Sequence, residues 1–474
     1  MYIDGQWCET DKKLAVVNPA DGQVVYRVSM GGKEQVDGAI AAAQRAFGTW
    51  SQTTAMARAD LLLTVAGLLM EKKRFFAETI TNEMGKPLRD ALGEVQLSID
   101  YFRWFAEEAR RVDGQVVPAG AADKRIFIIK QPVGVVGAIL PWNFPLGMLA
   151  RKVAPALAVG CTMVVKPASQ TPQTALEFCR VLETAGLPAG VFNLVVAPAQ
   201  VVADTFAASP EVRKITFTGS TEIGKKLMAD AAQTVKRVSM ELGGHAPYIV
   251  MDDADVELAV DGILNAKFRC SGQMCTAANR VYVQRGIADA YVKKVLELTM
   301  GLKVGDGREE DTVVGPLVNK SALEKVAAHV EDARRKGAAV LCGGRTLAEG
   351  PYAAGNFYAP TVLAGVTPDM AIYTEETFGP VVPVIFFDTE EELAQVMNHA
   401  QLGLAAYFYT NDLSRMWRIA EKLEYGIVGV NDPQPFGVQC PFGGVKESGF
   451  GREGGHQGID DYVVTKMISM RFKK

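Results

Sequence analysis

The sequence is poor in histidine and has no cysteine pair at metal-binding or redox spacing. Its four histidines, at positions 245, 329, 399 and 456, lie far apart, so a zinc site with the usual ligand spacing is not expected. Its seven cysteines form no Cys-x-x-Cys motif, and their odd number argues against a disulfide framework. These features exclude a secreted disulfide scaffold and indicate a metal-free protein of a reducing compartment.

A strong excess of charge and a long apolar run are also missing. The chain of 474 residues carries 50 basic and 54 acidic side chains, for a net charge of −4, which gives no general attraction to nucleic acid or anionic membrane. Its most apolar stretch, residues 133–150, is interrupted by Pro141, Asn143 and Pro145. The N-terminus resembles no secretory signal, so we expect a cytoplasmic protein without nucleic-acid or membrane partners.

Short apolar strands and helices alternate along the middle of the chain. Such alternation predicts right-handed crossovers and a parallel, doubly wound sheet of the nucleotide-binding type. The strands are expected at 134–140, 162–165, 192–195, 214–217 and 237–242, and the helices between them at 146–159, 172–186, 199–208 and 221–233. Further helices are expected at 34–50, 57–84 and 88–112, and at 255–269, 288–300, 322–336 and 414–423.

Two segments do not fit either alternating region. Residues 113–133 have the pattern of a protruding hairpin whose second arm, near residues 126–129, is apolar on both sides. Residues 461–474 have the pattern of a strand that could join this hairpin or another subunit. Exposed apolar strands usually mark interfaces, so we expect a homodimer or a dimer of dimers.

The stretch 267–280 presents a cysteine in a favourable place for chemistry. Ser271 and Gly272 break the preceding helical pattern and leave Cys275 on a loop before an apolar strand. A thiol on such a loop can be directed into a pocket and, when ionised, is a strong nucleophile. The alternative for any single cysteine is a buried structural role.

Polar and glycine residues follow the ends of several predicted strands, where ligands bind in parallel sheets. Glu241 ends one strand and could serve as a general base, or it could pair with a nearby cation. Asn143 could donate to developing charge or simply form a turn, and Lys166 could bind a ribose or phosphate or remain solvated.

The segment 217–226 follows a strand and begins a helix, so it favours phosphate binding or a simple helix cap. Gly219, Gly224 and Lys225 have P-loop spacing, but Lys226 replaces the hydroxyl residue that would bind Mg²⁺. An NTPase is therefore not expected. The common G-x-G-x-x-G dinucleotide motif is also absent from this segment.

Taken together, these stretches resemble the NAD(P)-dependent aldehyde dehydrogenase superfamily. The similarity covers essentially the whole chain in the correct order and is carried by segments 141–145, 166–172, 217–224, 241–244, 272–275, 375–380 and 441–444. It implies an α/β fold with a nucleotide-binding domain at 1–112 and 134–242, a catalytic domain at 243–455, and an oligomerisation segment at 113–133 and 456–474.

The resemblance also implies roles for individual residues. Cys275 corresponds to the nucleophile, Asn143 and the Cys275 N–H to the oxyanion hole, and Glu241 to the base that activates water against a thioester. The implied contacts to NAD or NADP are Pro141, Trp142, Lys166, Ser169, Gly219, Ser220, Leu242, Glu376 and Phe378.

Within the superfamily, the chain resembles succinate-semialdehyde dehydrogenases most. Arg151 and Arg269 match two arginines that hold the substrate carboxylate in that group, and Phe442 matches a substrate contact. The alternative is that each arginine pairs with a local acid. The loop at 432–440 lacks the serine often found there, so an α-ketoglutarate semialdehyde or another ω-oxo acid or aliphatic aldehyde competes as substrate.

Three further points follow from the resemblance. Ser169 stands where NAD-preferring relatives often carry glutamate, so NADP is expected alongside NAD. Ala277 replaces the second cysteine that serves some relatives as a redox partner, so no such switch is expected. A catalytically silent structural or binding member of the family is the alternative of another class.

Overall fold

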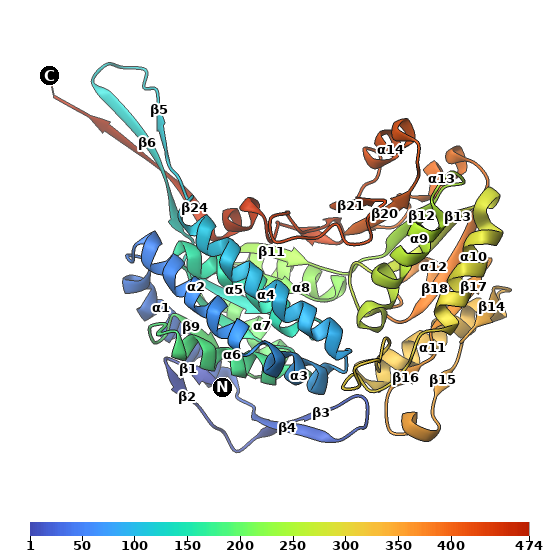
Figure 1. Ribbon diagram of the computed structural model, residues 1–474. Coiled ribbons are helices and arrows are strands. Elements are labelled where there is room, and N and C mark those ends of the chain that lie inside the picture. The colour runs from blue at the N-terminus through green and yellow to red at the C-terminus, as the bar shows by residue number, and fades with distance from the viewer. Residues whose placement is uncertain (474) are drawn as a thin grey trace.

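The computed structural model describes residues 1–473, which form two α/β halves side by side and a thin arm that projects from one of them (Figure 1). The arm consists of β5 (Gln115–Val117), β6 (Lys124–Pro132) and β24 (Val463–Arg471). Strand β24 pairs antiparallel with β6 from Val463 opposite Pro132 to Arg471 opposite Lys124. The end of the chain therefore completes the predicted hairpin within the same subunit.

The first sheet contains the strands predicted from the alternating pattern. Within residues 1–473 its order is β2 (Gln6–Trp7), β1 (Tyr2–Ile3), β9 (Phe192–Leu194), β8 (Thr162–Lys166), β7 (Val135–Ile139), β10 (Val212–Thr218), β11 (Arg237–Glu241) and β23 (Gly449–Phe450). The strands from β9 to β11 in this order are parallel, as predicted. Strand β23 pairs antiparallel with β11, so a short segment from late in the chain closes this edge.

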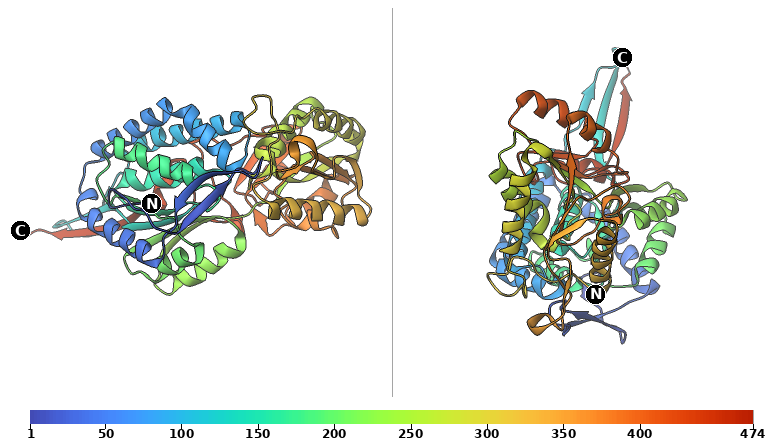
Figure 2. Two further views of the ribbon diagram at one scale, coloured as in Figure 1. Left: turned by 90° about the horizontal axis from the view of Figure 1, so that it is seen from below. Right: turned by 90° about the vertical axis from the view of Figure 1, so that its right-hand side faces the viewer.

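Helices cover both faces of this sheet, because successive side chains of its buried strands point to opposite sides. Val136 packs with α2, α4, α5 and α6, whereas Val135 packs with α1, α7 and α8. The view from below in Figure 2 shows the two helical layers. The helices of this half are α1 (Lys33–Trp50), α2 (Ala55–Glu71), α3 (Lys73–Met84), α4 (Leu88–Ala109), α5 (Pro145–Val159), α6 (Pro172–Thr184), α7 (Ala199–Ala208) and α8 (Thr221–Ala232).

The second half has the same layered construction. Its sheet, within the described part of the chain, runs β14 (Ala339–Cys342), β17 (Thr361–Ala364), β18 (Val381–Phe387), β13 (Ala278–Gln284), β12 (Ala246–Val250), β20 (Ala405–Tyr409) and β21 (Ile427–Val430), with only β14 antiparallel to its neighbour. Its helices are α9 (Val256–Ile263), α10 (Arg285–Met300), α11 (Lys320–Arg335), α12 (Ala371–Thr374), α13 (Glu390–Val396) and α14 (Leu413–Ala420).

Short two-stranded pairs complete the fold. They are β3 (Lys13–Val17) with β4 (Val24–Ser29), β15 (Thr346–Leu347) with β16 (Phe357–Tyr358), and β19 (Leu402–Gly403) with β22 (Val445–Lys446). Among residues 1–473, no helix combines the length and hydropathy that a membrane crossing would need.

The helix predicted at 57–84 is two helices, α2 and α3, that meet at Lys72. Lys72 leaves the helical region with φ −100° and ψ 15°. The charged run from Glu71 to Arg74 offers no apolar side chain to either helix, so the chain turns there and Phe76 resumes the buried face of α3.

The helix predicted at 255–269 is regular only as far as Ile263. A π-helical turn, Leu264–Phe268, follows, and it directs the consecutive residues Ala266, Lys267 and Phe268 inward. The strand predicted at 461–474 begins later, because His456–Tyr462 form a 3-10 turn before β24. Residue 474 lies outside the described residues.

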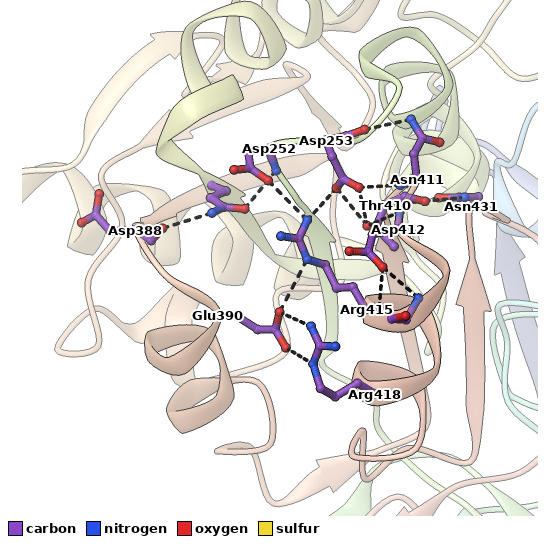
Figure 3. A network of polar contacts seen from close by, with 12 residues as sticks. Asp252, Asp253, Asp388, Glu390, Thr410, Asn411, Asp412, Arg415, Arg418 and Asn431 are labelled. Atoms are coloured by element: carbon purple, nitrogen blue, oxygen red, sulfur yellow. Dashed lines mark hydrogen bonds and ion pairs between the residues drawn. The ribbon is translucent and has the colours of Figure 1, made fainter.

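Helix α14 is attached to the second half through an ion-pair network (Figure 3). Arg415 Nη1 lies 2.8 Å from Asp253 Oδ1 and 3.3 Å from Asp252 Oδ1. Arg418 forms two hydrogen bonds, of 2.7 and 2.8 Å, with the carboxylate of Glu390 at the start of α13. The network therefore links the end of β12, the start of α13 and α14.

Replacing Arg415 with Met should lower the free energy of unfolding by roughly 1–2 kcal/mol, because the arginine side chain is only 19% exposed and forms ion pairs with several carboxylates. Urea unfolding measures the change. Arg74→Met, which removes a pair whose arginine is 64% exposed, is the control and should change stability by less than about 0.5 kcal/mol. Equal losses in the two variants would contradict this account of α14.

Candidate active site

The carboxyl ends of the parallel strands bring most of the predicted site residues to one edge of the first sheet. The register places Ile139 beside Lys166 and Phe217, and Thr218 beside Glu241. The segments that follow these strands are therefore neighbours in space, as expected for a ligand-binding edge of a doubly wound sheet.

The loop that carries Cys275 has an unusual backbone. Cys270, Ser271 and Gly272 all have positive φ, at 51°, 58° and 75°, a conformation that costs energy for residues other than glycine. The N–H of Cys270 donates to Asp90 Oδ2 at 2.8 Å, and the Ser271 hydroxyl donates to the Gly315 carbonyl at 3.0 Å. The predicted break therefore exists, and contacts from distant segments hold its shape.

Asn143 lies beside this loop. Its side-chain Nδ2 donates to the carbonyl of Gln273 at 3.0 Å, and the side chain is buried. On the other side, Gly244 packs against the Cys275 carbonyl so closely that a Cβ at position 244 would overlap it. The loops 141–145, 243–244 and 272–275 thus form one assembly around the half-buried Cys275.

Glu241, at the end of β11, is a buried carboxylate in an unusual environment. Among residues 1–473, neither of its side-chain oxygens has a hydrogen-bond partner. Burial raises its pKa well above the usual value, and the neighbouring Glu453 carboxylate raises it further, against the opposing charges of Lys152 and Arg151. Such a carboxylate can accept a proton near neutral pH.

Lys152 and Glu453 are functional candidates that the sequence analysis missed. Their side chains form a hydrogen-bonded ion pair next to Glu241, with Lys152 fully buried and also donating to Thr216 Oγ1 at 3.0 Å. A signal existed, because Lys152 lies with Arg151 in the apolar run of α5, and a buried lysine requires an acidic partner.

The surroundings of Cys275 favour its thiol form over the thiolate. Burial raises its pKa to about 12, and the carboxylates of Glu376 and Glu241 contribute in the same direction, while Arg151 opposes them. The nucleophile predicted from the sequence therefore needs a base when it reacts, and Glu241 is a neighbouring group of that kind.

The two arginines predicted to bind the substrate lie near aromatic rings. Arg151 is 4% exposed, with its guanidinium carbon 4.0 Å from the ring centre of Phe442 and 5.3 Å from that of Tyr101. Its Nη1 is 3.9 Å from Glu453, whose other oxygen binds Lys152, and within residues 1–473 its Nε has no partner. The guanidinium carbon of Arg269 lies 5.8 Å from the ring of Phe144.

Several predicted cofactor residues contact the loops that surround Cys275. Trp142 and Phe378 meet edge to face with 5.6 Å between ring centres. Glu376 accepts the N–H of Gly244 at 3.1 Å, and burial raises the pKa of its carboxyl to about 7. Pro141 directly precedes Trp142 in the same loop.

The phosphate side of this region is formed by the start of α8. Ser220 is the N-cap residue of α8, and no hydrogen bond from its side chain caps the helix within the described chain. Gly224 lies against Leu242, and a Cβ at position 219 would contact the ring of Phe217, so the backbone approaches closely here. Lys166 is buried, and burial lowers its pKa to about 8, whereas Ser169 is exposed.

These features fit a bound dinucleotide. The Thr218 hydroxyl is buried without a partner among residues 1–473, and the start of α8 offers free N–H groups that could bind a phosphate. Lys166, Ser220 and Glu376 would hold the ribose and phosphate groups, and the cofactor would supply a hydride acceptor.

Comparisons with known proteins agree with this geometry. The family model described as "Aldehyde dehydrogenase family" matches residues 7–468. A 3-sulfolactaldehyde dehydrogenase of Pseudomonas putida is 46% identical over 471 residues, which is 99% of this chain and 96% of that protein. The NADP(+) succinate-semialdehyde dehydrogenase GabD of Escherichia coli is 46% identical over 468 residues, 98% of this chain and 96% of that protein.

A solved structure gives the same result. The crystal structure of succinate-semialdehyde dehydrogenase from Burkholderia pseudomallei superimposes with a TM-score of 0.97 at 45% identity, covering 99% of this chain and 97% of that one. Fold, family match and full-length similarity agree, and the chain belongs to the aldehyde dehydrogenase family.

Proposed function

We propose that this protein oxidises a short aldehyde that carries an anionic group, with succinate semialdehyde as the preferred substrate and NADP or NAD as the hydride acceptor. The observation that carries the substrate class is Arg151, a buried guanidinium with an unpartnered Nε among residues 1–473, stacked on Phe442 next to Glu241. An anion at this point would complete the hydrogen bonding of a group that burial leaves unsatisfied.

The reaction begins with Cys275. Glu241 removes the thiol proton, and Sγ attacks the aldehyde carbon to give a thiohemiacetal. An amide nitrogen carries two hydrogens, so Asn143 can keep its bond to Gln273 and direct the second toward the oxyanion, together with the N–H of Cys275. A dinucleotide held by Lys166, Ser220 and Glu376 would supply the hydride acceptor for the substrate carbon.

The second half of the reaction releases the acid. Loss of the hydride leaves a thioester on Cys275. Glu241 first releases the thiol proton to solvent, and it then accepts a proton from the water that attacks the carbonyl carbon of the thioester. The C–S bond then breaks, and Cys275 leaves as a thiolate that regains a proton. Burial, together with the neighbouring charges of Glu453 and Lys152, sets the pKa at which this base works.

The activity should depend on pH through Glu241. This residue acts as a base only when ionised, so kcat should rise as the pH increases through its raised pKa. Glu453→Gln removes the neighbouring negative charge, lowers the pKa of Glu241, and should move the acid limb of the kcat profile down by about one pH unit.

A pH series of initial rates measures this shift. Glu424→Gln, which neutralises a 61%-exposed glutamate, is the control and should leave the profile in place. A shift of the Glu453→Gln profile to higher pH would show that Glu453 does not act on the base in this way.

We propose that Arg151 and Arg269 together bind the anionic group of the substrate, an arrangement that we call the anion clamp. This clamp predicts that carboxylated and neutral aldehydes respond differently to loss of one arginine. Arg269→Ala should lower kcat/KM for succinate semialdehyde about 10–100-fold more than for propanal, because only the first substrate presents a carboxylate. Arg103→Ala, which removes a 50%-exposed arginine of α4, should affect both substrates equally. An equal loss for both aldehydes in the Arg269 variant would remove the clamp from the proposal.

The substrate panel should compare succinate, glutarate and α-ketoglutarate semialdehydes, 3-sulfolactaldehyde and propanal with each cofactor. Formation of the reduced cofactor, followed by absorbance, separates an enzyme from a catalytically silent family member. Cys275→Ala should abolish this signal.

The cofactor proposal rests on Ser169 and Lys166. Ser169 is exposed beside the buried Lys166 and has no negative charge that would repel a 2′-phosphate. NADP is therefore accepted alongside NAD, which agrees with the NADP specificity in the name of the E. coli relative.

Introducing a carboxylate tests this point. Ser169→Glu should lower kcat/KM for NADP at least about tenfold while kcat/KM for NAD changes little, because the new charge repels only the extra phosphate. Ser169→Gln, of similar size but neutral, is the matched control. An unchanged preference in the Glu variant would refute the role of position 169.

We also propose the functional division expected from the sequence, with cofactor binding at 1–112 and 134–242, catalysis at 243–455, and subunit contacts at 113–133 and 456–474. The arm supports the last part, because Val116 on its β5 edge is 70% exposed and Met467 on β24 is 66% exposed. A homodimer or a dimer of dimers would cover these residues. The unpaired state of all seven cysteines in the described chain supports a cytoplasmic location.

A further inference from the structure

Two acidic residues near the start of α4 each bind a different loop of the active site. Asp90 and Glu94 are four residues apart, so their side chains lie on the same face of the helix. Asp90 accepts the N–H of Cys270, in the loop that leads to Cys275. Glu94 binds the segment that follows Asn143.

Glu94 forms a fully buried ion pair with Lys86. The distance between Lys86 Nζ and Glu94 Oε2 is 2.6 Å, and both side chains are 0% exposed. Lys86 Nζ also donates to the backbone carbonyl of Asn143 at 2.6 Å and lies 3.8 Å from the ring centre of Phe144. The lysine therefore binds directly to the residue whose amide is proposed to stabilise the oxyanion.

The second oxygen of Glu94 fixes the start of α5. Its Oε1 accepts the N–H groups of Leu146 and Gly147 at 2.9 and 3.0 Å. These groups belong to the first turn of the helix, where they have no partner within the helix itself. The carboxylate and its lysine thus bind the chain on both sides of Phe144 and determine where the Asn143 loop enters α5.

Direct contacts join the two loops. Asn143 donates to Gln273, and Phe144 packs against a small apolar cluster of Cys270, Met274 and Ala277. A buried ion pair contributes little to stability beyond what apolar side chains would contribute, because removing two charges from water is costly. What such a pair supplies between two catalytic loops is precise geometry.

We propose that Lys86 and Glu94, with Asp90 as a second contact, are positioning residues that hold the Asn143 amide at the distance from Cys275 that oxyanion stabilisation requires. They touch neither substrate nor cofactor and act through Asn143. The inference rests on aldehyde oxidation by the family and not on the choice of succinate semialdehyde as substrate.

A double-mutant cycle tests the proposal. Glu94→Gln keeps the size of the side chain but removes the charge that holds Lys86. It should lower the rate at which reduced cofactor forms in the first turnover about tenfold or more. Asn143→Ala should slow it about 100–1000-fold. In the Asn143→Ala background, Glu94→Gln should cost less than about twofold, because it has no amide left to position.

The rates should be measured by stopped flow on the full-length enzyme, with succinate semialdehyde and with propanal in parallel. Glu108→Gln is the control, since Glu108 is a buried carboxylate on the same helix that binds Arg111 and His456 instead. It should lower the melting temperature but change the first-turnover rate by less than about twofold. Losses from Glu94→Gln and Asn143→Ala that multiply would overturn the proposal.

A second variant separates positioning from stability. Lys86→Met/Glu94→Met replaces the ion pair with apolar side chains of similar volume, so that no unpaired charge is left buried. Because the N–H groups of Leu146 and Gly147 lose their acceptor, we expect a folded enzyme with a lower melting temperature and a first-turnover rate still reduced about tenfold. A folded double variant with the parental rate would show that the pair is only structural.

Discussion

Burial of charge next to the catalytic sulfur is the constraint on which the rest of the site depends. Glu241 and Glu453 share a region almost without solvent, and Lys152 and Arg151 provide the opposing charges. Water would weaken each of these interactions, and the low dielectric instead makes the carboxylate a stronger base and keeps Cys275 protonated until it reacts. The same burial leaves the Nε of Arg151 without a partner among residues 1–473 and thus free to bind a substrate anion, which connects the basicity of Glu241 with substrate selection.

The fold produces this environment by closing one sheet with segments from far along the chain. Gly443 and Phe442 cover Glu241 and Arg151, and β23 pairs with β11 at the same edge. The turn at 270–272, with its positive φ values, leads into the Cys275 loop, and Asp90 of α4 holds this turn by accepting the N–H of Cys270. The active site is therefore a junction of separate segments rather than a pocket within one domain.

Much of the fold could be predicted from local patterns. Apolar runs with glycine and proline at their ends predicted the strands of the first sheet, because buried parallel strands need apolar side chains on both faces. The prediction failed where tertiary packing overrides local spacing, as at Lys72, where one expected helix divides, and after Ile263, where the π turn begins. Of the site, the positions of Cys275, Asn143 and Glu241 at strand ends and loops could be predicted. Lys152 left a signal only as a lysine in an apolar helix, and Lys86, Glu94 and Glu453 left none.

The sequence by itself determined which chemical groups are available and on which elements they lie: a thiol on a loop, a carboxylate at a strand end, and arginines at two separate points. These properties depend on residue type and on spacing over a few residues. Only the tertiary structure decided which groups become neighbours. Arg151 lies 50 residues from Tyr101 and 302 from Glu453 along the chain, and Asn143 lies 130 residues from Gln273. Such pairings depend on strand order and on the packing of α4 and α5 rather than on local sequence. Burial, and with it the pKa of each catalytic group, follows from those pairings.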